Sequence, residues 1–463
     1  MMLLREFLRR LPMYLISYNG EVIHNNGDNY YTKKINDLNY DDIINVDIDP
    51  VYQNMNKEDD YIFLKEQPEF YCNFENFGKV TGIYNKKTRA VSFKNNDGKY
   101  LCFEGNNLVF TRDEANLWES FCPIDEKFIK KLQYVILNKW ISKRTGEIFD
   151  GKNITFCSDF IMKIGTFSID IRSQHVADFE EYKFIGFCDT WKFEEFLLYN
   201  PLIYITAYSS KSVLNQLSLC VRALRNFADF DGRIIVMSNE DTTSIRSICS
   251  MDGDDNIDVD HMDPKDFVGY VCSKFSILGK DIYSGYQPVM YLDPDIIFNS
   301  DLNKMLQEAT LTEDICAPLE DFHRVQTHVP VGAGLIQLDS LTPSPYAAGF
   351  NGGTIIFPNT DNTKVKEFLD AARRSITNIG EFFGRDFNLW ADQEVINYLS
   401  IKNFNINTSC ISKYAKYVDH NPSINENLTG FVHFWGHDSD KKSELMKIYF
   451  DKVEYIRYKL EKS

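Results

Sequence analysis

Two carboxylates stand one residue apart where an apolar segment ends. Asp293 and Asp295 follow the run Val289–Leu292 and precede the run Ile296–Phe298. A carboxylate at the end of a buried strand is costly unless it is paired or bound to a cation. Two hard oxygen donors this close together suit Mg²⁺ or Mn²⁺, which in turn bind phosphate oxygens. The alternative is an ordinary solvated turn after a strand.

Two other polar segments stand beside expected secondary structure. Asn351 and two glycines precede the apolar run 354–357, and glycines at such a place let the backbone approach a ligand closely. Asp392 and Gln393 precede a run with helical spacing, where capping of the helix would also explain them. Each segment alone is equally compatible with a plain turn or a helix start.

A histidine lies in a third apolar segment near the end of the chain. His433 stands within Phe431–Trp435, and Gly436 follows it at once. A histidine in an apolar strand is more often a core residue than a ligand, although imidazole is also a common metal ligand.

Together and in this order, these segments resemble the motifs of glycosyltransferase family 8, whose catalytic domain has the GT-A fold. In that family an Asp-x-Asp pair and a His-Phe/Tyr-x-Gly segment surround the metal and the diphosphate. The resemblance implies that Asp293, Asp295 and His433 bind Mn²⁺ or Mg²⁺. It also implies that Asn351, Asp392 and Gln393 contact the reacting sugar.

The resemblance further implies a set of nucleotide and diphosphate contacts. The family has one lysine after its histidine segment, and here the lysine is displaced by a few residues, so two neighbouring lysines share the assignment. At the end of the first strand, the base and ribose would bind at the carboxyl edge of an open α/β sheet. The implied contacts are Thr206, Ala207, Tyr208, Lys274, Gly352, Gly353, Gly436, Lys441 and Lys442.

The activity implied by this resemblance is transfer of a hexose from a UDP-sugar to an acceptor hydroxyl, with retention of anomeric configuration. One alternative is an inverting transferase in which a carboxylate such as Asp392 acts as general base. Another is a glycan- or protein-binding scaffold whose transferase domain is inactive, and a metal-dependent nucleotidyl transferase ranks behind both. The acceptor is left open between a glycan, a protein and a lipid-linked molecule. Residues 320–346 either shape its pocket or form a surface insertion.

The elements that must position these residues follow from hydrophobic periodicity. Residues 202–207 read as a buried parallel strand, 212–227 as a helix and 233–237 as a second strand. Such a unit predicts an α/β sheet with helices on its faces. We therefore expect a GT-A, Rossmann-like mixed sheet flanked by helices over residues 196–463, closed by an amphipathic helix at 441–460.

Residues 1–195 have a different pattern, with short apolar runs separated by Asn-Gly and Asp-Gly turns. Residues 90–110 read as three short strands, followed by Trp118 and Phe121 as two large apolar anchors. This segment resembles one repeat of a fascin-like β-trefoil, with weaker copies at 13–34 and 134–169. We expect a β-rich, trefoil-like domain that binds an acceptor glycan or a protein, or that only packs on its neighbour.

Composition limits the partners and the compartment. A formal net charge of −17 disfavours nucleic acid and anionic membranes as main partners. The ten cysteines form no CxxC pair, which predicts reduced, buried thiols and a cytoplasmic protein. No stretch approaches the ~20 apolar residues of a membrane span. The short run Leu3–Leu11 is either an ordinary first helix or an amphipathic contact to a membrane surface.

Overall fold

The computed structural model describes most of the 463-residue chain. The described residues are 13–25, 30–34, 47–48, 69–74, 77–85, 87–88, 90–104, 107–153, 155–157, 160–164, 167–171, 180–187, 193–208, 210–383, 391–417, 428–436 and 438–462. The chain divides into two compact units, Met1–Leu198 and Tyr199–Ser463, which are described separately. A boundary between residues 195 and 196 would fall inside a strand, β17 (Phe193–Leu198), which belongs to the first unit as a whole.

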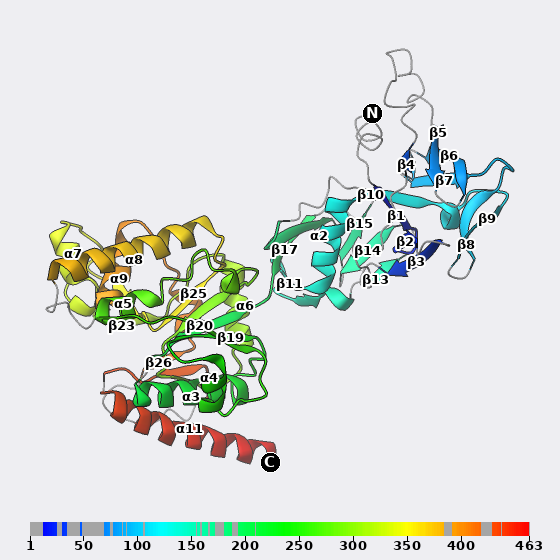
Figure 1. Ribbon diagram of the computed structural model, residues 1–463. Helices are drawn as coiled ribbons and strands as arrows, with labels where there is room; N and C mark the ends of the chain where they lie inside the picture. Colours follow the sequence, from blue (N-terminus) through cyan, green and yellow to red (C-terminus); the bar gives the residue numbers. More distant parts are fainter. Residues whose placement is uncertain are drawn as a thin grey trace. The chain divides into compact units, whose positions relative to one another are not determined.

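The first unit contains a ten-stranded sheet (Figure 1). Its order is β10-β1-β2-β3-β9-β8-β7-β6-β5-β4, and β10 also pairs with β7, so the strands from β10 to β7 form a closed ring. Closure of a sheet removes its exposed edges. The strands are β1 (Met13–Ser17), β2 (Glu21–Asn25), β3 (Tyr30–Lys34), β4 (Asp47–Ile48), β5 (Glu69–Phe74), β6 (Gly78–Asn85), β7 (Ala90–Lys94), β8 (Tyr100–Glu104), β9 (Asn107–Arg112) and β10 (Phe121–Asp125).

A helix and two smaller sheets complete this unit. The core beneath them is aromatic: the Trp140 ring meets the Phe184 ring edge-on at 4.7 Å, and Phe184 stacks on Phe196. The helix is α2 (Glu126–Leu137). The sheets run β12-β11-β17-β16 and β13-β14-β15, made of β11 (Lys139–Ser142), β12 (Ile148–Asp150), β13 (Thr155–Cys157), β14 (Ile161–Ile164), β15 (Phe167–Asp170), β16 (Lys183–Phe187) and β17.

The prediction of a β-rich first unit is confirmed, and two of its details need correction. The hairpin expected at 90–103 is present as β7 and β8, with a turn closed by a hydrogen bond from the Asn95 amide to the Lys99 carbonyl. Trp118, however, is not a buried anchor. Its side chain is 63% exposed because it lies in a short 3-10 helix, Leu117–Glu119, that turns Glu119 inward instead. The copy expected at 134–169 also begins inside helix α2. The trefoil itself stays a prediction.

The second unit is built on a five-stranded mixed sheet of order β20-β19-β18-β21-β25. The first four strands are parallel, and β25 runs antiparallel to β21. Helix α3 (Lys211–Asn226) connects β18 to β19, so the strand–helix–strand unit expected from the sequence is confirmed. The strands are β18 (Leu202–Thr206), β19 (Arg233–Ser238), β20 (Ile257–His261), β21 (Val289–Leu292) and β25 (Thr354–Phe357).

Helices cover both faces of this sheet. In Figure 1, α5 (Phe267–Ser273), α8 (Thr363–Phe383) and α9 (Ala391–Lys402) lie on one side, with α3, α4 (Thr242–Ile248) and α11 (Ser439–Lys462) on the other. The first group packs on the sheet through one apolar cluster that includes Tyr204, Phe357 and Phe368. Helices α3 and α11 share another cluster, in which Phe227 meets Phe450. The expected mixed sheet flanked by helices is therefore confirmed.

Two small sheets lie beside the main one. The first has the order β22-β27-β26, and the second pairs β23 with β24. Their strands are β22 (Ile296–Phe298), β27 (Phe431–His433), β26 (Ala415–Tyr417), β23 (Leu319–Arg324) and β24 (Ala348–Phe350). The remaining helices are α6 (Asn303–Thr312), α7 (Ala333–Leu338) and α10 (Ser409–Ser412).

Three expectations from composition can be compared with these elements. Within the described part of the chain, no helix combines the length and the apolar character that a membrane crossing requires. The run Leu3–Leu11 lies outside the described residues. Eight cysteines whose side chains are described are free thiols, and all of these but Cys410 are buried: Cys72, Cys102, Cys122, Cys220, Cys249, Cys272, Cys316 and Cys410.

Candidate metal centre and its pocket

The two carboxylates expected from the sequence lie in the connection between β21 and β22. Both strands are fully buried, so the connection starts and ends in the core. Its backbone is fixed at both ends: the Asp293 amide donates to the Gly353 carbonyl at 2.7 Å, and the Phe434 amide donates to the Asp295 carbonyl at 2.9 Å. The sequence thus places both aspartates at the carboxyl edge of the sheet, within reach of β25 and β27.

Asp293, Asp295 and His433 form a compact group of potential metal ligands. One donor atom from each lies within 4.8 Å of the others. His433 Nε2 is 3.1 Å from Asp295 Oδ1 and 3.9 Å from Asp293 Oδ2. Asp295 Oδ1 is buried and, within the described chain, has no aligned hydrogen-bond partner, although the imidazole lies close to it. Buried polar atoms are normally paired, so this incomplete pairing fits a cation held between oxygen and nitrogen donors.

A glycine lies against this group. A Cβ atom at Gly353 would come within 2.6 Å of both Asp293 Oδ2 and His433 Cε1. Real Cβ atoms do not approach other atoms so closely, and the nearby groups are held by the sheet. The position therefore accepts only a residue without a side chain, which explains one of the two glycines before β25.

Positive charge from α11 completes the group. Lys442 Nζ lies 2.7 Å from Asp295 Oδ2. Burial alone would raise the pKa of Asp295, but the charges of His433 and Lys442 outweigh it and hold that pKa below its ordinary value. Burial would likewise lower the pKa values of His433 and Lys442, but the adjacent Asp295 carboxylate outweighs burial and raises both.

Asp293 is linked to the end of β18 by two hydroxyl groups. The Tyr291 hydroxyl donates to Asp293 Oδ1 at 2.5 Å and also lies 3.0 Å from Thr206 Oγ1. Burial raises the pKa of Asp293 above its ordinary value, while the Lys274 charge opposes this shift. The metal group and the expected nucleotide-binding edge are therefore joined through hydrogen bonds.

The other residues expected at that edge lie beside the first strand. Ala207 is buried, and its amide donates to the Met237 carbonyl at 3.0 Å. The Tyr208 ring meets the Tyr270 ring at 5.1 Å, and burial raises the pKa of the Tyr208 hydroxyl to about 12. These residues do not line the cavity described below.

Lys274 and Asp392 form a buried ion pair beneath the glycine segment. Lys274 Nζ also donates to the Gly352 carbonyl at 3.1 Å and lies 4.8 Å above the Tyr291 ring. Burial alone would lower the pKa of Lys274, but the carboxylates of Asp392 and Asp293 outweigh it and raise that pKa. Lys274 therefore supports the glycine segment and Asp392 from outside the cavity and is not part of the cavity lining.

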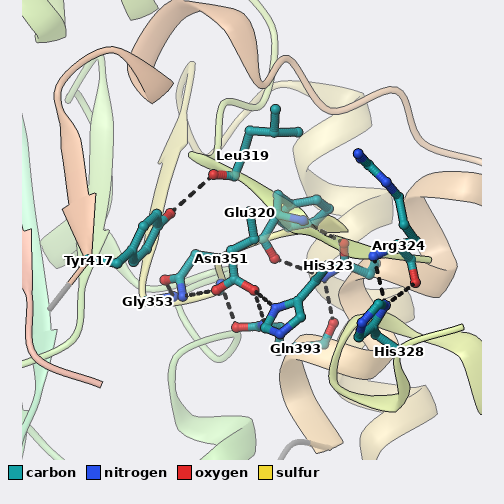
Figure 2. Close-up of polar contacts among 12 residues, drawn as sticks. Leu319, Glu320, His323, Arg324, His328, Asn351, Gly353, Gln393 and Tyr417 are labelled. Atoms are coloured by element: carbon teal, nitrogen blue, oxygen red, sulfur yellow. Dashed lines mark hydrogen bonds and ion pairs between the residues drawn. The ribbon is translucent and has the colours of Figure 1, made fainter. Parts of the chain in front are cut away.

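Two amide side chains meet at a buried carboxylate that the sequence analysis did not single out (Figure 2). Asn351 Nδ2 donates to Glu320 Oε1 at 2.6 Å, and Gln393 Nε2 donates to Glu320 Oε2 at 3.2 Å. The other ends of the amides accept from the glycine backbone: Asn351 Oδ1 from Gly353 and Gln393 Oε1 from Gly352. Both amides therefore hold the glycine segment as well as facing the cavity.

These groups surround one cavity of about 510 Å³. Most of the residues expected from the sequence line it: Asp293, Asp295, Asn351, Gly352, Gly353, Asp392, Gln393, His433, Gly436 and Lys442. Four further residues line it that were not named as site residues: Glu320, His323, Pro330 and Trp435. Glu320 and His323 belong to the stretch 320–346 that was expected to shape a pocket or form an insertion.

The two candidate lysines, Lys441 and Lys442, lie in different environments. Lys442 lines the cavity, whereas Lys441 Nζ pairs with Glu444 at 2.8 Å on the exposed surface of α11. Adjacent residues of a helix point about 100° apart, so only one of them can face the cavity.

Comparison with known proteins gives distant likenesses only. No protein-family model matches the chain, and no curated protein matches its sequence. Among solved structures, the chain is similar to the galactosyltransferase LgtC with donor and acceptor sugar analogues, at 16% identity over 53% of this chain and 95% of that one, with a TM-score of 0.36. Mouse xyloside xylosyltransferase 1 matches at 12% identity over 51% and 97%, with a TM-score of 0.34. The glycosyltransferase GlyE of Streptococcus pneumoniae TIGR4 matches at 12% identity over 57% and 64%, with a TM-score of 0.33.

Proposed function

We propose that the second unit is a metal-dependent glycosyltransferase of the GT-A type that moves a hexose from a UDP-sugar to an acceptor hydroxyl. One observation carries the proposal: Asp293, Asp295 and His433 converge beside Lys442 at the carboxyl edge of an open α/β sheet. Ligands of such sheets bind at that edge. The motif resemblance to glycosyltransferase family 8 supports the same reading.

The donor set suits a divalent cation that binds phosphate. Asp293, Asp295 and His433 would hold Mn²⁺ or Mg²⁺, which when bound supplies Lewis-acid stabilisation of charge on the diphosphate. Lys442 adds a cation that lies within the same group and can neutralise the leaving UDP. Gly436 has a φ of 85°, so its left-handed backbone turns the chain between His433 and α11.

The remaining cavity residues would hold the sugar. Asn351 and Gln393 each use one hydrogen of their amide group on Glu320, which leaves a second hydrogen for a sugar hydroxyl. Asp392 keeps one carboxylate oxygen available beyond its pair with Lys274. The base and ribose would bind near Thr206, Ala207 and Tyr208.

We further propose that transfer retains the anomeric configuration, as the family resemblance implies. The acceptor would then attack from the face that UDP leaves. In the inverting alternative, Asp392 would take the proton of the acceptor hydroxyl. NMR of the first-formed product separates the two, because it reports the anomer before any mutarotation.

The decisive experiment is UDP release from a panel of UDP-sugars, with and without Mn²⁺, by the wild type and by Asp295→Ala. We expect Mn²⁺-dependent release from one donor and a loss of at least about 100-fold in the variant. Asp252→Ala, which alters an exposed aspartate, is the matched control and should behave as the wild type. The absence of release from every donor, together with the absence of metal-dependent UDP binding, would reject the proposal.

That rejection would favour the scaffold alternative. In it, the first unit would be a trefoil-like module that binds a glycan or a protein, and the second unit would have no turnover. Glycan binding by the full chain that is unaffected by Asp295→Ala would point to this reading.

A further inference from the structure

The strand that supplies Glu320 is irregular beside the cavity. In the pairing of β23 with β24, Glu320 lies opposite Gly349, but Arg324 lies opposite Ala348, the adjacent residue. The residues between them therefore bulge out of the ladder. In a regular strand, residues 320 and 323 would point to opposite faces, whereas the bulge lets both line the same cavity.

Glu320 and His323 form a carboxylate–imidazole pair at this bulge (Figure 2). His323 Nδ1 lies 2.8 Å from Glu320 Oε2, and the Glu320 side chain is only 3% exposed. A carboxylate accepts hydrogen bonds, so the neutral imidazole carries its proton on Nδ1 and offers the Nε2 lone pair as an acceptor. The His323 side chain is 20% exposed and lines the cavity, so a ligand there can reach the imidazole.

Aromatic rings stand next to the pair. Phe322 is 47% exposed and lies nearly parallel to Trp435, with ring centroids 6.3 Å apart and an interplanar angle of 13°. Tyr417 meets Phe322 edge-on at 6.1 Å. Trp435 lines the cavity, and in the described chain its buried Nε1–H has no hydrogen-bond partner. The mouth of the cavity thus combines apolar ring faces with the partly exposed imidazole of His323.

We propose that this mouth is the acceptor subsite and that the acceptor is a sugar. The inference rests on the proposed function of the same cavity. A pyranose has an apolar C–H face that packs against an aromatic ring, surrounded by hydroxyls that pair with polar groups. The C–H face lies against Phe322 and Trp435, and one hydroxyl donates to His323 Nε2. Glu320 is a positioning residue, because it fixes the tautomer of His323.

The other two acceptor classes fit less well. A serine or threonine hydroxyl carries no ring face that would use the exposed Phe322. A lipid chain would need a longer apolar channel, whereas this cavity is lined by carboxylates, imidazoles and amides. The polar lining instead matches a ligand with several hydroxyls.

The test measures two reactions of the full chain with the donor found in the UDP-sugar panel. UDP release without acceptor gives hydrolysis, and product mass after addition of methyl pyranosides and disaccharides gives transfer. A Ser/Thr peptide and a polyprenyl phosphate that carries no sugar serve as the competing acceptor probes. We expect transfer to a saccharide and not to the other two.

Phe322→Ala should separate the two reactions. It should lower kcat/KM for the saccharide about tenfold or more, while hydrolysis stays within about twofold of wild type, because water needs no aromatic platform. His323→Gln should lower kcat/KM for the saccharide to a similar extent. Phe193→Ala removes another exposed phenylalanine, in the first unit, and should alter neither reaction. A folding defect would lower hydrolysis as well and is thereby recognised.

The outcomes separate a failure of the acceptor inference from a failure of the proposed glycosyltransferase function. Absence of both UDP release and metal-dependent UDP binding in the wild type rejects the proposed function. Normal hydrolysis with transfer only to the peptide or the lipid-linked probe, or to no saccharide, overturns the acceptor inference alone. So does saccharide transfer that both variants leave unchanged.

Discussion

The two units of the chain bury different kinds of side chain. The first unit packs aromatic rings around Trp140, and its buried carboxylates Glu119 and Glu194 lie near arginines at its surface. The second unit buries Asp295, Glu320 and His433 around one cavity, and Lys274 is buried next to its lining. Burial of charge is costly in both units, and among the described residues it is concentrated in the second.

The buried polar groups of the two units differ in how many of their hydrogen bonds are made within the protein. Glu194 receives Arg144 Nε at 3.0 Å and the Ser142 hydroxyl, so its burial is compensated within the protein. At the metal group, Asp295 Oδ1 and His433 Nδ1 remain without aligned partners in the described chain. The incomplete hydrogen bonding of these two atoms is what a bound cation would satisfy.

The strongest test of the aromatic core is Trp140→Ala. The variant removes a fully buried ring and leaves the Val135 carbonyl without the indole donor that it receives at 2.8 Å. We expect the free energy of unfolding of the first unit to fall by about 3–5 kcal/mol, measured by urea titration. Below the unfolding transition, Mn²⁺ affinity should not change. A parallel loss of metal affinity would show that the stability of the first unit and metal binding by the second are coupled.

Gly353→Ala tests the crowding at the metal group. The added methyl group would press on Asp293 and His433, so we expect Mn²⁺ affinity to fall about 10–100-fold, measured by calorimetry. Gly253→Ala is the matched control, because a Cβ there meets nothing within 4 Å. Equal affinities in the two variants would mean that the site is looser than this geometry implies.

The two adjacent lysines of α11 give the smallest of these effects and the sharpest contrast. Lys442→Ala should lower UDP affinity about tenfold at saturating Mn²⁺, because a charge beside the diphosphate site is lost. Lys441→Ala removes only an exposed pair with Glu444 and should change UDP affinity less than about twofold. Titration of UDP by calorimetry distinguishes them, and a larger effect at Lys441 would reverse the assignment.

Local patterns predicted the elements of the second unit well. The apolar run ending at Thr206, the helix after it and the next strand could be read from periodicity, and so could the position of Asp293 and Asp295 after a buried strand. Spacing alone could not choose between Lys441 and Lys442. That choice depends on the rotation of α11 about its axis, which long-range packing on α3 sets.

Other features depend on contacts that sequence patterns do not carry. The bulge in β23 arises from its pairing with β24, so alternation along the strand gives no sign that Glu320 and His323 face the same cavity. Trp118 was expected to be buried because it is large and apolar, yet the short helix that holds it turns Glu119 inward. In both places irregular local geometry decides which side chain faces inward.

The bulge in β23 also has a consequence for insertions and deletions between Glu320 and Arg324. Three residues separate Glu320 from Arg324, while their partners Gly349 and Ala348 are adjacent. Removal or addition of one residue here would rotate Glu320 or His323 away from the cavity. This stretch should therefore tolerate neither deletions nor insertions, although strand interruptions elsewhere are common places for both.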